Sequence, residues 1–167
     1  MEGKMLYLLL AALCVAIDQG TKLLALAKLS GAGEVEVLPG IFHLHLSMNS
    51  GASLGIFSGQ RWLLVGLSAV AVAFMVWIIA TKKFRTRGLL LGISLVLGGA
   101  AGNLVDRALR GEVVDMIFFP WIGKIPLLPD FICNMADIFL SFGAVIFIVF
   151  YAVEETRRAR EESQNEA

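Results

Sequence analysis

The sequence is poor in the residues that build disulfide frameworks, metal sites and basic surfaces. Its two cysteines, Cys14 and Cys133, form no CxxC motif, and Cys14 lies within an apolar run. Its two histidines, His43 and His45, are too few and too isolated to form a metal site by themselves. The formal net charge is zero, so no excess of positive charge indicates a nucleic-acid partner. We therefore expect no disulfide framework, metal, cofactor or nucleic acid.

Long apolar runs are what the chain has in excess. Hydrophobic residues make up 57% of it, whereas soluble domains are usually about half apolar. Four runs approach the ~20 residues that cross the hydrocarbon core of a bilayer, and backbone groups in lipid must bond internally, so we predict helices. They lie at about residues 5–26, 62–80, 88–109 and 136–153. Asp18 and Lys22 interrupt the first run, which favours a retained helix over a cleaved signal peptide.

Basic residues set the expected orientation. Because positive charge concentrates in cytoplasmic segments, the link between the second and third runs and the tail at 154–167 are predicted to be cytoplasmic. The basic residues concerned are Lys82, Lys83, Arg85, Arg87, Arg157, Arg158 and Arg160. Both termini then lie inside, the connections at about 28–61 and 110–134 lie outside, and residues 1–167 form a single membrane domain. The end of the tail is expected to be a frayed helix or disordered.

The first outer connection has the pattern of a small sheet. The segments EVEVL and FHLHLS both alternate apolar and polar residues around a turn at Pro39 and Gly40. His43 and His45 share one face, interpreted as solvated. The second outer connection carries three prolines and several aromatic residues, and we expect it to be a loop at the membrane interface. The predicted fold class is an all-α membrane protein with four transmembrane helices and a small extracytoplasmic β-sheet.

Polar residues from four separate stretches are expected to converge on the outer side of the membrane. At ~1.5 Å per residue, Asp18 lies ~20 Å from the inner end of the first helix. Helical spacing of i, i+3 and i+4 then places others on shared faces. The converging residues are Asp18, Lys22, Asn103, Asp106, Arg107, Asp115, Asn134 and Asp137.

Two of these acids are candidates for chemistry. Arg107 is the expected partner of Asp106 or Asp18, which leaves Asp115 and Asp137 without an obvious cation. If two carboxyl groups approach closely, they cannot both ionise easily, and the pair shares a proton. One can then accept a proton from water while the other polarises a peptide carbonyl, as in aspartic proteases. A nearby asparagine could orient a carboxylate or hold the oxyanion.

The motifs, in order and spacing, resemble those of the lipoprotein signal peptidases (signal peptidase II) of the bacterial cytoplasmic membrane. The matching segments are DQGTK at 18–22, NSGASLG at 49–55, GNLVDR at 102–107, VVD at 113–115 and NMAD at 134–137. The resemblance implies a metal-independent aspartyl protease with its active site at the extracytoplasmic face. Its substrates would be diacylglyceryl-modified prolipoproteins, cut just before the lipidated cysteine. We expect a monomer in contact with membrane lipid.

The resemblance also implies roles for single residues. Asp115 and Asp137 match the catalytic pair, and Asn103 and Asn134 match residues that support it. The residues that match a structural polar network are Asp18, Lys22, Asp106 and Arg107. Those that match an outer loop contacting substrate are Asn49, Gly51 and Ala52. Cys133 and Met116 stand where the family commonly has Phe. These departures affect the expected shape of the substrate cleft and leave the two acids unchanged.

Two other classes of protein are alternatives. A small proton-coupled transporter could also bury acids in the membrane, but the second and fourth runs offer almost no polar residues toward the inner face. A non-catalytic membrane scaffold leaves the carboxylate pair unexplained. Other intramembrane proteases fit less well, because HExxH, GxSG and GxGD motifs are absent. A Ser/Lys dyad of Ser53 with Lys22 is conceivable, but the family pattern gives neither residue that role.

Overall fold

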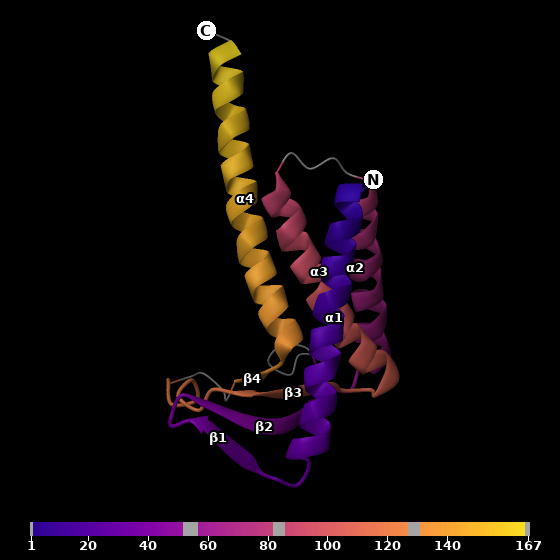
Figure 1. Cartoon of the computed structure of the whole chain (residues 1–167), viewed down its shortest axis with the longest axis vertical. Helices are drawn as coiled ribbons and strands as arrows, with labels where there is room; N and C mark the ends of the chain where they lie inside the picture. The colour runs from indigo at the N-terminus through magenta and orange to yellow at the C-terminus, as the bar shows by residue number, and fades with distance from the viewer. Residues whose placement is uncertain (1, 52–56, 82–85, 127–130, 166–167) are drawn as a thin grey trace.

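Four long helices and a small sheet make up the protein (Figure 1). The computed structural model describes residues 2–51, 57–81, 86–126 and 131–165. Its helices are α1 (Glu2–Leu29), α2 (Arg61–Thr81), α3 (Arg87–Leu109) and α4 (Met135–Asn165). Within this described part, all four are long and apolar enough to cross a membrane. The predicted fold class is confirmed.

The sheet lies across one end of the helices (Figure 1). Its antiparallel strands, in spatial order, are β1 (Glu34–Leu38), β2 (Phe42–Asn49), β3 (Val113–Phe118) and β4 (Ile132–Cys133). The β1–β2 hairpin was predicted, and Gly40 has a φ of 68° at its turn. The second connection, expected to be a loop, instead supplies β3 and β4. Residues Val113–Ile117 are all buried, so β3 shows no alternation of apolar and polar residues.

Helix α3 occupies the centre of the bundle and packs against the other three helices. Its glycines allow the neighbouring backbones to approach closely. A Cβ atom at Gly98 would lie 2.5 Å from Cys14 Cβ on α1, and one at Gly99 would lie 2.4 Å from the carbonyl oxygen of Ala136 on α4. Small residues at such crossings are typical of helices that associate within lipid.

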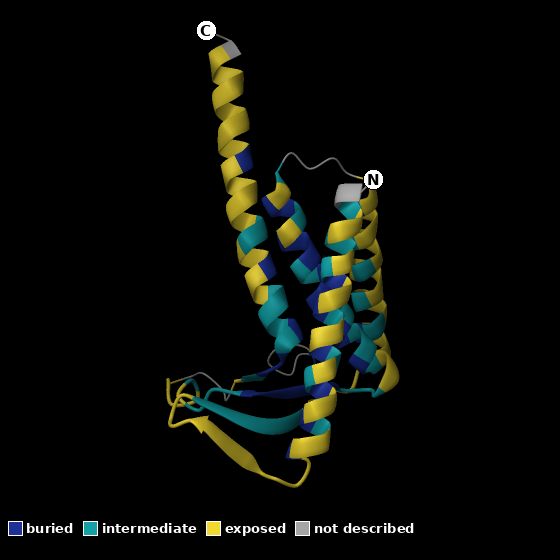
Figure 2. Cartoon of the chain, in the orientation of Figure 1, coloured by how far each residue is buried: buried dark blue, intermediate teal, exposed yellow. Residues whose placement is uncertain are grey.

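The outward faces of the other three helices are apolar and exposed, as Figure 2 shows by their yellow stripes. Examples are Leu13 on α1, Phe74 on α2 and Ile148 on α4. Soluble monomers rarely expose apolar surfaces of this extent. The surface is therefore that of a bundle surrounded by lipid hydrocarbon.

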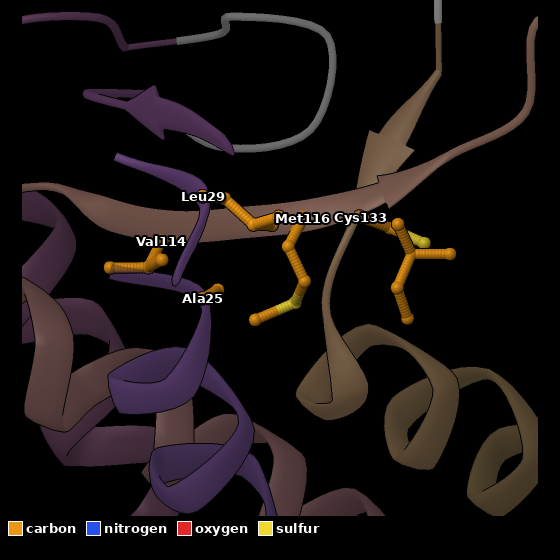
Figure 3. Packing of buried hydrophobic residues seen from close by; sticks show 6 residues of the cluster. Ala25, Leu29, Val114, Met116 and Cys133 are labelled. Atoms are coloured by element: carbon orange, nitrogen blue, oxygen red, sulfur yellow. The ribbon is translucent and has the colours of Figure 1, made fainter. Parts of the chain in front are cut away.

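A compact apolar cluster joins the end of α1 to the sheet. Ala25 and Leu29 of α1 pack with Val114 and Met116 of β3 and with Cys133 of β4 (Figure 3). Val114 is fully buried. This packing fixes the sheet on the bundle at the point where the polar residues gather.

Beyond the bundle, α4 continues as a helix through Asn165, whereas a frayed or disordered tail was expected. Two ion pairs of Arg158 contribute to the helical structure of this segment. Arg158 forms ion pairs of 2.9 Å with Glu154 and 3.1 Å with Glu155, at helical spacings of i, i+4 and i, i+3. Glu154 also accepts a hydrogen bond from the Thr86 hydroxyl at the start of α3, which ties the two helices together.

Candidate active site

The first turn of α4 is closed by a reciprocal pair of hydrogen bonds. The backbone N–H of Asn134 donates to Asp137 Oδ2 at 3.1 Å, and the backbone N–H of Asp137 donates to Asn134 Oδ1 at 3.1 Å. This is the geometry of a capping box, with Asn134 as N-cap and Asp137 at the third helical position. The helix start therefore fixes both side chains.

Asp115 lies on β3 opposite Ser47 of β2. Its side chain is buried, with only 3% of the residue exposed. Asn134 Nδ2 donates to Asp115 Oδ1 at 2.6 Å, and Asn49 Nδ2 donates to Asp115 Oδ2 at 3.1 Å. The carboxyl group is thus held from both sides by amide donors, one from the helix start and one from the neighbouring strand.

Asn103 of α3 completes the connection between the two acids. Its Nδ2 donates to Asp137 Oδ1 at 3.0 Å, and its Oδ1 accepts from Asn134 Nδ2 at 3.2 Å. Asn134 therefore contacts both acids and Asn103 as well. The structure brings together the predicted pair, Asp115 and Asp137, with both predicted supporting asparagines.

The charge balance of this pair is unusual for buried acids. Among the described residues, neither Asp115 nor Asp137 forms an ion pair. Burial, with a smaller contribution from the negative charge of Asp137, raises the pKa of Asp115 to about 6, against the hydrogen bonds from Asn49 and Asn134. This carboxyl group therefore keeps its proton to a higher pH than an ordinary aspartate does.

A second, fully buried polar network supports the first. Lys22 Nζ lies 2.8 Å from Asp18 Oδ2 and 3.0 Å from Asp106 Oδ2, and all three side chains have 0% exposure. Asp18 Oδ1 accepts the backbone N–H of Ala136 at 2.9 Å, while Asp106 Oδ2 accepts that of Val114 at 3.1 Å. Each of these acids thus binds the backbone of the residue that directly precedes Asp137 or Asp115.

The prediction that Arg107 pairs with Asp106 or Asp18 is wrong. Lys22 binds both acids, and Arg110 forms a further ion pair with Asp106. Arg107 instead donates to the carbonyl oxygen of Gly51 at 2.8 Å. A lysine one turn from Asp18 on the same helix reaches both acids, whereas the Arg107 guanidinium faces the segment that follows β2.

The predicted substrate loop lies partly beside the pair. Asn49 contacts Asp115, and its Oδ1 accepts the backbone N–H of Gly51 at 3.0 Å. Arg107 holds the other side of Gly51, which is buried. Ala52 lies outside the described residues.

Two network residues were missed by sequence reasoning. Gln19 donates to Asp106 Oδ1 at 3.0 Å and to the carbonyl oxygen of Gly102 at 3.1 Å. Arg110 donates to Gln19 Oε1 at 2.9 Å, besides its ion pair with Asp106. The signal was available: Gln19 adjoins Asp18, and Arg110 follows Asp106 by four residues, one helical turn.

The histidines and cysteines lie outside this chemistry. His43 contacts Glu34 and Glu36 across the β1–β2 hairpin and is largely buried, so its face of the sheet is less solvated than expected. In the described ranges, no group of three potential metal ligands occurs. Burial and the nearby carboxylates of Asp137 and Asp115 raise the pKa of Cys133 to about 12, so this thiol stays protonated.

Comparisons with known proteins agree with this geometry. Residues 10–153 match the family described as Signal peptidase (SPase) II. The lipoprotein signal peptidase of Symbiobacterium thermophilum is 36% identical over 151 residues, covering 90% of this chain and 97% of the relative. That of Cupriavidus taiwanensis is 37% identical over 160 residues, covering 93% and 85%.

A solved bacterial membrane enzyme, determined by the in meso method at 2.3 Å resolution, has the same fold with a TM-score of 0.76. It is 29% identical, and the match covers 90% of this chain and 88% of that one. These matches favour a peptidase over a transporter or a scaffold. The chain belongs to the signal peptidase II family of aspartic peptidases, which are multi-pass bacterial membrane proteins.

Proposed function

We propose that Asp115 and Asp137 hydrolyse the peptide bond that precedes the lipidated cysteine of diacylglyceryl-modified prolipoproteins. The relatives are lipoprotein signal peptidases by name. The observation that carries the proposal is the Asn134 side chain, whose Nδ2 holds Asp115 while its Oδ1 binds the backbone of Asp137. One asparagine thereby sets the relative position of two acids that form no ion pair within the described part of the chain.

The two acids have different environments and therefore different roles. Asp115 is the more buried and holds the shared proton, because its pKa is raised to about 6. Asp137 is partly exposed, so water can reach it, and it accepts two N–H donors, from Asn103 and from the Asn134 backbone. We assign Asp115 as the initial acid and Asp137 as the initial base.

The reaction then balances without a cofactor. Asp137 takes a proton from water, the water oxygen bonds to the scissile carbonyl carbon, and Asp115 gives its proton to the carbonyl oxygen. The tetrahedral intermediate collapses when Asp137 protonates the leaving nitrogen and the C–N bond breaks. Asp115 recovers a proton from one hydroxyl, which leaves a carboxylic acid and an amine. One water molecule is consumed.

The site is proposed to lie at the extracytoplasmic face of the membrane. The end of α2 and the start of α3 lie at the opposite end of the bundle from the sheet (Figure 1). The sequence between them carries Lys82, Lys83 and Arg85, and positive residues favour the cytoplasmic side. The substrate's acyl chains would remain in lipid while its backbone lies near Asn49 and Gly51. Ala52 belongs to the same proposed substrate segment.

A cleavage assay with purified enzyme in lipid tests the proposal. The enzyme is expected to process a diacylglyceryl-modified prolipoprotein and to leave the unlipidated precursor uncut. Asp115→Asn and Asp137→Asn should each lower the rate at least ~1000-fold, because each removes a proton-transfer group. Glu112→Gln, which removes an acid near the start of β3, is the matched control and should keep normal activity.

Three results would contradict the proposal. Equal cleavage of the unlipidated precursor would remove the lipid requirement. Full activity of either Asp→Asn variant would exclude the acid pair. Loss of activity in Glu112→Gln, with the folded amount unchanged, would point to a different acid.

A further inference from the structure

Lys22 forms one hydrogen bond in addition to its two ion pairs. Its ammonium group has three N–H donors. Two of them go to Asp18 Oδ2 and Asp106 Oδ2, and the third goes to Asn103 Oδ1 at 2.8 Å. The first two contacts neutralise buried acids. The third connects this ion network to Asn103 of the candidate active site.

That third contact settles which way the Asn103 amide faces. Asn103 Oδ1 meets two donors, Lys22 Nζ at 2.8 Å and Asn134 Nδ2 at 3.2 Å. A lysine ammonium can only donate, so the oxygen of the amide must lie on the Lys22 side. The NH2 group consequently faces Asp137, to which it donates at 3.0 Å.

We propose that Lys22 is a positioning residue for the acid pair, because its ammonium group locks the Asn103 amide with Nδ2 aimed at Asp137. The inference rests on the proposed function of Asp115 and Asp137. If the amide turned over, its oxygen would face the Asp137 carboxylate and repel it. Lys22 thus keeps an N–H donor of Asn103 on the carboxyl group that is proposed to accept a proton from water.

The charges around Lys22 fit this role. Asp18, Asp106, Lys22 and Arg110 sum to zero formal charge, and Gln19 bonds both acids. Because the network is neutral as a whole, the third N–H of Lys22 is not needed to balance charge. It is fully buried and still requires an acceptor, and that acceptor is Asn103 Oδ1, which belongs to the site.

The test uses two substitutions of equal length that differ in their ability to donate. Lys22→Gln keeps an N–H donor toward Asn103 and Lys22→Met has none. Both are made together with Asp18→Asn, so that one cation and one anion are removed and the network stays neutral. Activity is measured as kcat per folded enzyme, with the folded amount determined by thermal unfolding in detergent.

We expect kcat of the Lys22→Met variant to be roughly 10- to 100-fold below that of the Lys22→Gln variant, the usual cost of losing an outer hydrogen-bond partner of a reacting group. The pH profiles of the two variants should also differ, because only Lys22→Gln keeps the Asn103 donor aimed at Asp137. Adding Asn103→Ala to both variants should abolish the difference, since Lys22 acts through Asn103.

Equal kcat values and equal pH profiles for the two variants would overturn the inference, as would a difference that persists after Asn103→Ala. If neither variant folds, the unmodified enzyme decides: its Asn103 Nδ2 protons should titrate together with the acid pair in NMR spectra, and a signal that does not titrate rejects the role. If the Lys22→Gln and Lys22→Met variants have equal kcat values while Asp115→Asn and Asp137→Asn are inactive, only the role of Lys22 is rejected. Activity of those Asp→Asn variants would reject the proposed function instead.

Discussion

Asn134 and Asp137 bind each other twice across the first turn of α4, through two backbone-to-side-chain hydrogen bonds of 3.1 Å. The start of the helix and the position of the acid are therefore one structural feature. Because Asn134 Nδ2 also reaches Asp115 at 2.6 Å, the same residue connects the helix start to the sheet.

The two functions of Asn134 can be separated by substitution. Asn134→Ser keeps an N-cap oxygen for the Asp137 N–H but loses the donor to Asp115, and Asn134→Ala loses both. We expect both variants to lower kcat by roughly 100-fold, since each leaves Asp115 without this donor. Only Asn134→Ala should also lose ~1 kcal/mol of stability. Near-normal kcat in Asn134→Ser would mean that the cap alone matters.

The rate should depend on pH through Asp115. A raised pKa of about 6 means that the pair holds its proton below this pH and loses it above. The value of kcat/KM, which reports the free enzyme, is therefore expected to fall tenfold per pH unit above about pH 6. Bound substrate buries the pair further, so the corresponding limb of kcat should lie at higher pH. A kcat/KM that stays flat up to pH 9 would contradict this.

The same group links stability to pH. Because the folded-state pKa of Asp115 lies above the usual 3.8, its contribution to stability is complete below about pH 4 and is lost as the pH rises through about 6. The whole effect is at most ~3 kcal/mol. The thermal stability of the unmodified protein relative to Asp115→Asn should decline across this window, and an increase would reverse the assigned sign.

Close packing at Gly102 predicts that alanine substitutions at Gly102 and at Gly20 have very different effects on stability. A Cβ at Gly102 would lie 2.5 Å from Asp18 Oδ2, an atom that Lys22 already binds, so Asp18 cannot move away without breaking an ion pair. Gly102→Ala should cost about 1–3 kcal/mol by overpacking. Gly20→Ala is the control, because nothing lies within 4 Å of the added methyl group. Unfolding in detergent measures both, and equal effects would refute the packing argument.

Asp106 is expected to contribute to the stability of the fold and not to the reaction. Asp106→Ala removes the acid bound by Lys22 and Arg110 and leaves the Val114 N–H without its acceptor, at a cost of about 3–5 kcal/mol. The yield of folded protein should drop accordingly, and Asp106→Asn, which keeps an oxygen, should drop less. Normal yield with lost turnover would place Asp106 among the reacting groups.

Part of the site was predictable because several of its polar residues lie on strongly apolar helices. Spacing of i, i+3 and i+4 is enough to place Asn103, Asp106 and Lys22 on inward faces. The partner of each acid was harder to predict. Lys22 and Arg107 both lie one turn or less from an acid on their own helices, and only the crossing of α1 over α3 at Gly98 and Gly102 decides that Lys22 reaches both acids.

The strands of the second connection escaped prediction for a different reason. Alternation of apolar and polar residues predicts a strand, as in EVEVL, but β3 is buried on both faces and so lacks this pattern, and β4 has only two residues. β3 pairs with β2 and β4 pairs with β3, and no local pattern in the sequence records pairings between segments so far apart in the chain. The position of Asp115 opposite Ser47 follows from this pairing alone.

Helix α1 begins and α4 ends on the side of the bundle that lies away from the sheet (Figure 1). An affinity tag, fluorescent reporter or surface tether joined to either end would therefore lie at the end of the bundle away from Asp115 and Asp137. Immobilised or labelled enzyme can be prepared by such fusions, leaving the proposed substrate-binding face unobstructed.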